Sequence, residues 1–238
     1  MREYNEAYMI QILECTLRDG SYSIDFQFTP KDTAIIASAL ENAGFRYIEV
    51  GHGVGLNAGA KGKGIAAATD EEYMEAAANA LRKAHWGMFF IPGIGRFEDI
   101  HIASKYGMNF IRIGTNANEV EQSAPYVEYA KKLGMMVSAN LMKSYIYSPG
   151  DLASQAKLSQ DYGVDIVSLV DSAGTMLPED VRQYVLEMQS VLDVPVGLHC
   201  HDNLSLGIAN CLAAIEAGAQ RLDTTIQGMG RGGGESCD

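Results

Sequence analysis

Short apolar runs alternate with longer amphipathic stretches along the whole chain of 238 residues. Each run is rich in β-branched or aromatic residues and leads through a polar loop into an amphipathic stretch, which ends near a glycine. Alternating strands and helices pair in parallel, so this pattern predicts an α/β fold with a parallel sheet. The runs lie at residues 9–14, 45–50, 87–91, 110–114, 135–140, 165–170, 194–199 and 221–226. Eight parallel strands are what a closed (β/α)8 TIM barrel requires.

The amphipathic stretches carry helix start and stop signals. Thr29 precedes Pro30 and Asp32, which supplies an N-cap and a proline at the first helical position. Thr69 with Glu72 has the spacing of a capping box. The predicted helix ends carry glycine, which accepts the left-handed conformation beyond the last turn. These glycines are Gly44, Gly107, Gly134, Gly163 and Gly218.

The chain has enough apolar residues, 47%, for one large core, and we expect a single domain over residues 1–238. After the last predicted strand the sequence leaves no room for the eighth helix of a TIM barrel. We therefore expect this barrel to lack its final helix. Either the chain is truncated at its C-terminus, or a second subunit covers the open flank in a homo-oligomer.

Charge and composition exclude several classes of partner. Eighteen basic and thirty acidic side chains give a net charge of −12, and no dense run of Lys or Arg could follow a nucleic acid backbone. No apolar run approaches the roughly 20 residues of a membrane span, and the N-terminus lacks a signal-peptide pattern. We expect a cytoplasmic protein. The cysteines form no C-x-x-C pair, which argues against a zinc knuckle or redox motif.

Polar residues gather where four of the predicted strands end, at 16–20, 49–52, 171–174 and 199–203. TIM barrels carry their reactive groups at these strand ends. His199 and His201 face the same way because side chains alternate along a strand, and Cys200 between them points away. With the Asp19 carboxylate, these two imidazoles would form one face of an octahedral site for a divalent ion.

Arg18 lies beside the predicted metal ligand Asp19. Its planar guanidinium suits the stabilisation of an enolate oxygen or the binding of a carboxylate. A structural ion pair with Glu49 is the alternative, and Glu49 could also orient a catalytic arginine. The glycine-rich segment 228–234 lacks the patterns of dinucleotide and phosphate loops, and is weak evidence for any ligand.

Together these motifs resemble the DRE-TIM metallolyases, an HMGL-like superfamily named for the residues found here as Asp19, Arg18 and Glu49. The matching segments are 16–20, 48–53, 171–174, 199–207 and 228–230. The runs HGVGLNAG (52–59), PGIG (92–95) and HDNLSLGIAN (201–210) are most similar to the aldolase domain of 4-hydroxy-2-oxovalerate aldolases.

The resemblance implies an activity and a set of roles. Asp19, His199 and His201 would bind Mn²⁺ or Mg²⁺, Arg18 would stabilise the enolate, and Ser172 would help to hold the substrate carboxylate. The reaction would be the reversible cleavage of a 4-hydroxy-2-oxoacid into two products, an aldehyde and pyruvate, which is itself a 2-oxoacid. An aldehyde dehydrogenase is the partner of such aldolases, but the region that contacts it has no counterpart here.

Two departures from the aldolase pattern leave alternatives open. Tyr22 replaces the histidine thought to be the base, and Glu235 replaces an asparagine, so that contact of Glu235 with the metal is undecided. His52 titrates in the right range for a base, although a supporting hydrogen-bonding role is an alternative. Our hypothesis is that a water linked to Tyr22 and His52 passes the proton, with His52 as the titrating member. An acyl-CoA-dependent Claisen synthase, like isopropylmalate or homocitrate synthase, and a non-catalytic metal-binding barrel are the competing interpretations.

Overall fold

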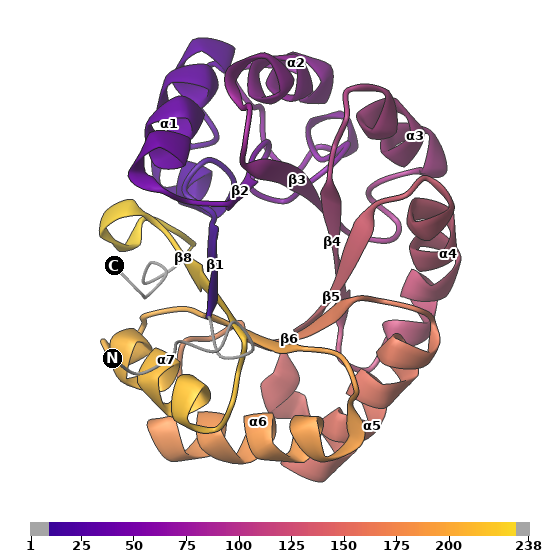
Figure 1. The fold of residues 1–238 in the computed structure, drawn as a ribbon, viewed down its shortest axis with the longest axis vertical. Helices are drawn as coiled ribbons and strands as arrows, with labels where there is room; N and C mark the ends of the chain where they lie inside the picture. Colours follow the sequence, from indigo (N-terminus) through magenta and orange to yellow (C-terminus); the bar gives the residue numbers. More distant parts are fainter. Residues whose placement is uncertain (1–9, 232–238) are drawn as a thin grey trace, which may run out of the picture.

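The computed structural model describes residues 10–231, and its eight parallel strands pair in chain order into a closed barrel (Figure 1). The predicted TIM barrel is therefore confirmed, and each strand overlaps the run that predicted it. The strands are β1 (Gln11–Glu14), β2 (Tyr47–Glu49), β3 (His85–Phe90), β4 (Phe110–Asn116), β5 (Met136–Met142), β6 (Ile166–Asp171), β7 (Val196–Cys200) and β8 (Arg221–Thr224).

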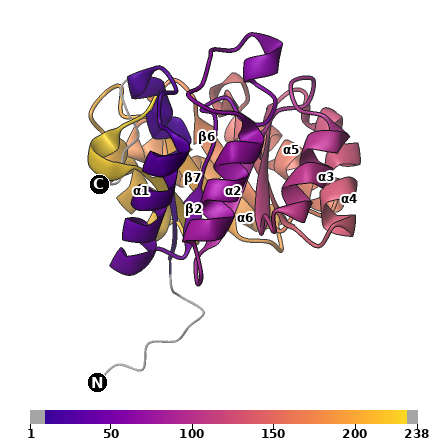
Figure 2. The same ribbon diagram turned by 90° about the horizontal axis from the view of Figure 1, so that it is seen from above.

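Helices surround the barrel and connect its strands (Figures 1 and 2). They are α1 (Pro30–Ala43), α2 (Asp70–Ala80), α3 (Phe97–Lys105), α4 (Ala124–Lys132), α5 (Pro149–Asp161), α6 (Pro178–Val191) and α7 (Gly207–Glu216). Short 3-10 helices lie in the loops: η2 (Asp19–Ile24), η3 (Gly59–Lys61), η4 (Val120–Ser123), η5 (Ser144–Ile146) and η6 (Ile226–Gly228). None of the helices among residues 10–231 is long and apolar enough to cross a membrane.

The residues predicted to start and end helices do so in the structure. Thr29 and Thr69 each close a capping box with the residue three positions later, at the starts of α1 and α2. Gly44 ends α1 with φ +106°, and a Cβ added there would meet nothing within 4 Å. The backbone conformation, rather than lack of space, is therefore what requires glycine at this position.

Within the described part of the chain, β8 is followed only by the 3-10 helix η6, so the flank between α7 and α1 has no α-helix of its own there (Figure 1). Ile208, Leu212 and Ile215 are exposed on α7, and Ile226 is exposed in η6. Apolar side chains in such numbers favour a covering partner or segment. That this flank is covered by another subunit or by further chain stays a prediction.

The main apolar core lies around the barrel, where the strands face the helices. The inside of the barrel differs from this apolar core because it contains charged residues. Its largest fully buried side chains are those of Arg112 and Arg221. A smaller apolar cluster of Leu13, Cys15 and Phe110 packs inside the barrel. The barrel therefore holds buried charges in a region that branched aliphatic side chains usually fill.

Glu14 is a buried acid at the end of β1, beside a hollow of about 330 Å³ that Phe45, Thr224 and Ile226 also line. Burial raises the pKa of Glu14 to about 7, although hydrogen bonds from Thr16 act in the opposite direction. The folded protein thus holds this proton more tightly than the unfolded chain does. Stability from this group is complete below the ordinary pKa of 4.5 and is lost as the pH rises to about 7.

Replacing Glu14 by glutamine is expected to flatten the dependence of stability on pH in this window. A shift from 4.5 to about 7 corresponds to at most about 3 kcal/mol at neutral pH. Urea unfolding at pH 5 and pH 8 measures the difference between the parent and Glu14→Gln. Parallel loss of stability in both proteins between these pH values would show that Glu14 is not responsible.

Candidate metal centre and active site

Asp19, His199 and His201 meet at the C-terminal end of the barrel. Their ligand atoms all lie within 4.8 Å of one another, and all three residues are buried. Asp19 is placed by a tight turn after β1, in which the Cys15 carbonyl accepts the N–H groups of residues 18, 19 and 20. His199 lies in β7 and His201 directly follows it. The three residues predicted to share a metal ion are therefore brought together.

The hydrogen bonds of the two imidazoles suit a metal ion. His199 Nδ1 bonds Asp223 Oδ2 at 2.7 Å, and His201 Nδ1 bonds the Asp171 carbonyl at 2.9 Å. His199 Nε2 lies 3.4 Å from Asp19 Oδ2, while His201 Nε2 is buried without a hydrogen-bond partner among the described residues. Burial also lowers the pKa of His201, which favours the neutral, metal-binding form. The donor set fits a hard to borderline divalent ion.

Arg18 is held between two carboxylates. Its Nη1 lies 2.5 Å from Asp19 Oδ2, and its Nε lies 2.6 Å from Glu49 Oε2. The guanidinium also lies over the Phe89 ring, 4.8 Å from the ring centroid. The predicted ion pair with Glu49 is therefore present, and it fixes the orientation of an arginine that lines the cavity; a catalytic role for Arg18 stays a prediction.

A narrow cavity of about 60 Å³ lies at this end of the barrel. The predicted ligands and Arg18, Tyr22 and Ser172 all line it. Ser172 follows β6, and its Oγ accepts the backbone N–H of Lys143 at 2.9 Å, which fixes the hydroxyl near the cavity. Tyr22 belongs to η2, and burial raises the pKa of its phenol more than Arg18 lowers it.

His52 lies outside this cavity. Its Nδ1 accepts the N–H of Val54 at 3.1 Å, and in the matching tautomer its Nε2 donates to the Gly64 carbonyl at 3.2 Å. The ring stacks on Phe26, with centroids 4.1 Å apart. With both nitrogens engaged by the backbone, the structure favours the supporting role for His52, which fastens the loop between β2 and α2.

Five further residues were missed by sequence reasoning. Asn140, Phe89 and Arg231 line the cavity. Asn140 lies in β5 near its C-terminal end, a position that the strand-end rule covers. Arg112 and Asp223 lie deeper in the barrel; Arg112 is a charge at the centre of an otherwise apolar run, whereas the run around Asp223 is itself polar and gives no such signal.

Cys200 and the described part of the glycine-rich segment lie beside the predicted metal ligands. Cys200 Sγ lies 3.8 Å from Cys211 Sγ and outside the ligand cluster, so the prediction that it points away is confirmed. The described part of the glycine-rich segment, residues 228–231, approaches the site, because the Arg231 N–H donates to Asp19 Oδ1 at 3.1 Å. Glu235 lies outside the described residues.

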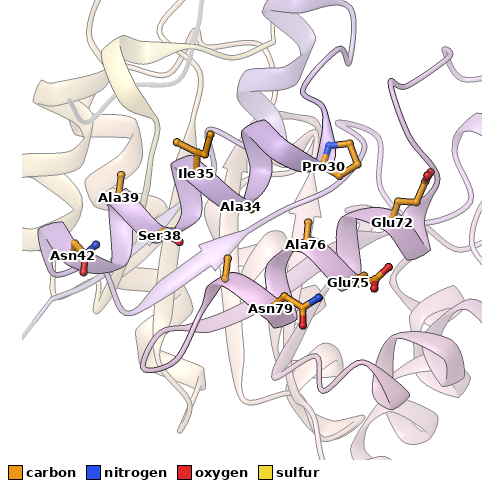
Figure 3. A pocket seen from close by; sticks show the side chains of 11 residues that line it. Pro30, Ala34, Ile35, Ser38, Ala39, Asn42, Glu72, Glu75, Ala76 and Asn79 are labelled. Carbon is orange, nitrogen blue, oxygen red and sulfur yellow. The ribbon is translucent and has the colours of Figure 1, made fainter.

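A larger hollow of about 890 Å³ lies between α1 and α2 (Figure 3). Its lining consists mainly of small and amide side chains, with Glu72 and Glu75 as the titratable groups. It lies among the outer helices, away from the strand ends. The chemistry of the protein therefore concentrates in the smaller cavity.

Comparisons with known proteins agree with this geometry. The HMGL-like family model matches residues 9–237. A 4-hydroxy-2-oxovalerate aldolase from Carboxydothermus hydrogenoformans is 43% identical over 230 residues, which cover 97% of this chain and 68% of the relative. An oxaloacetate decarboxylase from Mycobacterium tuberculosis is 45% identical over 223 residues, covering 94% of this chain and 66% of the relative. The chain thus spans about two thirds of the length of these relatives.

Solved structures share the barrel. The N-terminal domain of a candidate aldolase from Bacteroides vulgatus superposes with a TM-score of 0.76 at 27% identity, covering 95% of this chain and 76% of that one. The carboxyl transferase domain of pyruvate carboxylase from Rhizobium etli gives a TM-score of 0.83 at 18% identity, covering 97% and 42%. The second likeness shows the fold alone.

Proposed function

The chain belongs to the HMGL-like family, and from this membership we propose that it is a divalent-metal-dependent carbon–carbon lyase that forms the enolate of pyruvate. The substrate we favour is a 4-hydroxy-2-oxoacid, which is cleaved reversibly to pyruvate and an aldehyde. The observation that carries this proposal is the convergence of Asp19, His199 and His201 on one cavity with Arg18. The names of the relatives agree with an aldolase.

In this proposal Asp19, His199 and His201 hold Mn²⁺ or Mg²⁺. The ion, when bound, supplies a Lewis acid that polarises the keto group of the substrate. Arg18 donates hydrogen bonds to the oxygen on which negative charge develops, and Glu49 keeps its guanidinium in place. Ser172 and Asn140 offer polar groups to the carboxylate end of the substrate.

Aldol cleavage also requires that the proton of the 4-hydroxyl be removed. The titratable side chains that line the cavity, among the described residues, are the three ligands, two arginines and Tyr22. The raised pKa of Tyr22 keeps its phenol protonated at neutral pH, so it donates a hydrogen bond rather than accepting the proton. We therefore propose that a water held by Tyr22 takes this proton and passes it to bulk solvent, with His52 supporting the loop nearby.

None of the described side chains that line the cavity is an evident base for the hydroxyl proton. This favours a second candidate reaction that needs no such base, the decarboxylation of oxaloacetate. There the C3–C4 bond breaks, CO₂ leaves with no hydroxyl proton to be removed, and the same enolate remains. Arg231 lies at the cavity, where a guanidinium could bind the second carboxylate of such a substrate. One relative carries the name of this activity.

The Claisen synthase and the non-catalytic barrel remain as alternatives with less support, because the curated relatives that we compared are named as an aldolase and a decarboxylase. Both of these relatives are named for an activity on a small-molecule 2-oxoacid. The aldehyde, a homo-oligomer and an aldehyde dehydrogenase partner stay predictions.

Pyruvate in deuterated water provides the test. With Mn²⁺ we expect the methyl protons of pyruvate to exchange, EDTA to stop the exchange, and added Mn²⁺ or Mg²⁺ to restore it. The same preparation is then given 4-hydroxy-2-oxovalerate and oxaloacetate, and the two values of kcat/KM rank the candidate reactions. Exchange that persists in EDTA would exclude the metal mechanism. Turnover of acetyl-CoA with a 2-oxoacid, without pyruvate exchange, would favour the Claisen alternative.

A further inference from the structure

Two buried residues beneath the cavity connect the predicted metal site to Arg18. Arg112 belongs to β4 and Asp223 to β8, which lie on opposite sides of the barrel (Figure 1). Their exposed fractions are 1% and 4%, and neither lines the cavity. They form an ion pair across the barrel interior. Neither residue can touch a substrate in the cavity, so any influence on the reaction passes through other side chains.

Each of the two residues also contacts the machinery above it. Asp223 Oδ2 lies 2.7 Å from His199 Nδ1. Arg112 Nη1 lies 2.8 Å from Glu49 Oε2, the same oxygen that receives Arg18 Nε. A continuous row of hydrogen bonds and ion pairs therefore leads from His199 through Asp223, Arg112, Glu49 and Arg18 to Asp19.

The contact with Asp223 determines which ring nitrogen of His199 carries the proton. The Asp223 carboxylate accepts a hydrogen bond from the N–H of His199 Nδ1, which leaves the lone pair of Nε2 available to a metal ion beside Asp19. Arg112 pairs with Asp223 in the barrel interior and with Glu49 Oε2 at 2.8 Å. Arg112 thus holds the Asp223 carboxylate in place while it braces Glu49, and through Glu49 it braces Arg18.

We propose that Asp223 and Arg112 are positioning residues: Asp223 fixes the tautomer and orientation of His199 for metal binding, and Arg112 couples that support to the orientation of Arg18. The inference rests on the metal site of the proposed function. It adds two residues that act on the metal ligand and on the enolate-stabilising arginine from outside the cavity.

The first experiment uses the parent chain without metal. Spectra of ¹⁵N-labelled histidine at pH 8 report which ring nitrogen carries the proton, and the His199 signal is identified by its loss in His199→Asn. We expect the Nδ1–H tautomer for His199. The Nε2–H tautomer would overturn the proposal, and this result does not depend on any variant at position 223 or 112 folding.

The second experiment measures Mn²⁺ binding by calorimetry. Asp223→Asn is expected to weaken Mn²⁺ binding about 10- to 100-fold, the usual effect of losing the partner of a metal-bound histidine. Arg112→Lys keeps a charge beside Asp223 but loses the fork that also reaches Glu49. We therefore expect near-parental Mn²⁺ affinity and a fall in kcat at saturating Mn²⁺, with little change in KM.

Arg221→Lys is the matched control, because Arg221 is an equally buried arginine of the same barrel whose hydrogen bond goes to Gln11, and lysine keeps the positive charge near Asp223. It is expected to change the melting temperature without changing Mn²⁺ affinity or kcat. Parental Mn²⁺ affinity in a folded Asp223→Asn, or equal kcat in Arg112→Lys and Arg221→Lys, would reduce the row to a structural role. A parent that binds no Mn²⁺ would instead contradict the proposed function.

Discussion

Replacing Arg18 by lysine is expected to lower kcat about 100- to 1000-fold, the range seen when one preorganised donor to a developing oxyanion is lost. Lysine retains the positive charge, but it lacks the planar fork with which the guanidinium bonds Asp19 and Glu49. The charge beside Asp19 persists, so Mn²⁺ affinity should stay within about threefold of the parent. Steady-state kinetics at saturating Mn²⁺ and calorimetry of Mn²⁺ binding measure the two effects separately.

Arg221→Lys is again the appropriate control, since it tests whether any Arg-to-Lys change inside this barrel lowers activity. It removes a guanidinium from the barrel without touching the cavity. Near-parental kcat in Arg18→Lys would make Arg18 a structural residue. A loss of Mn²⁺ affinity equal to the loss of kcat would mean that Arg18 acts by orienting Asp19 instead of stabilising the enolate.

The fold was predictable because its signals are local. Each strand is a short apolar run, and the caps at Thr29 and Thr69 need only residues three positions apart. The cluster that could hold a metal ion was predictable for a related reason: strand ends of a barrel converge, and His199 and His201 share one side of a strand.

The support beneath the site was not predictable in this way. Arg112 and Asp223 are 111 positions apart in the sequence, and which buried charge pairs with which depends on the diameter and stagger of the barrel. The same limit applies to His52. Its spacing from the second strand suggested the mouth of the barrel, yet its partners, Val54 and Gly64, are set by the path of a loop that periodicity does not describe.

His201→Ala is expected to have the largest effect on metal binding. His201 Nε2 is buried without a hydrogen-bond partner among the described residues, so it contributes little to the apo fold. Losing a ligand costs more than losing its outer partner, which itself costs about 10- to 100-fold. We therefore expect Mn²⁺ affinity to fall at least about 100-fold, and kcat/KM at physiological metal to fall at least as far.

His52→Asn is the discriminating comparison for this prediction, because His52 is another buried histidine near the same mouth whose nitrogens both bond the backbone. Its Mn²⁺ affinity is expected to match that of the parent, as measured by calorimetry. In His201→Ala the melting temperature of the metal-free protein should stay close to the parental value, while the rise on adding Mn²⁺ should disappear. If the metal-free variant were instead strongly destabilised, His201 would be a core histidine held by the Asp171 carbonyl. Unchanged Mn²⁺ affinity would move the ion elsewhere and leave the enolate chemistry without its Lewis acid.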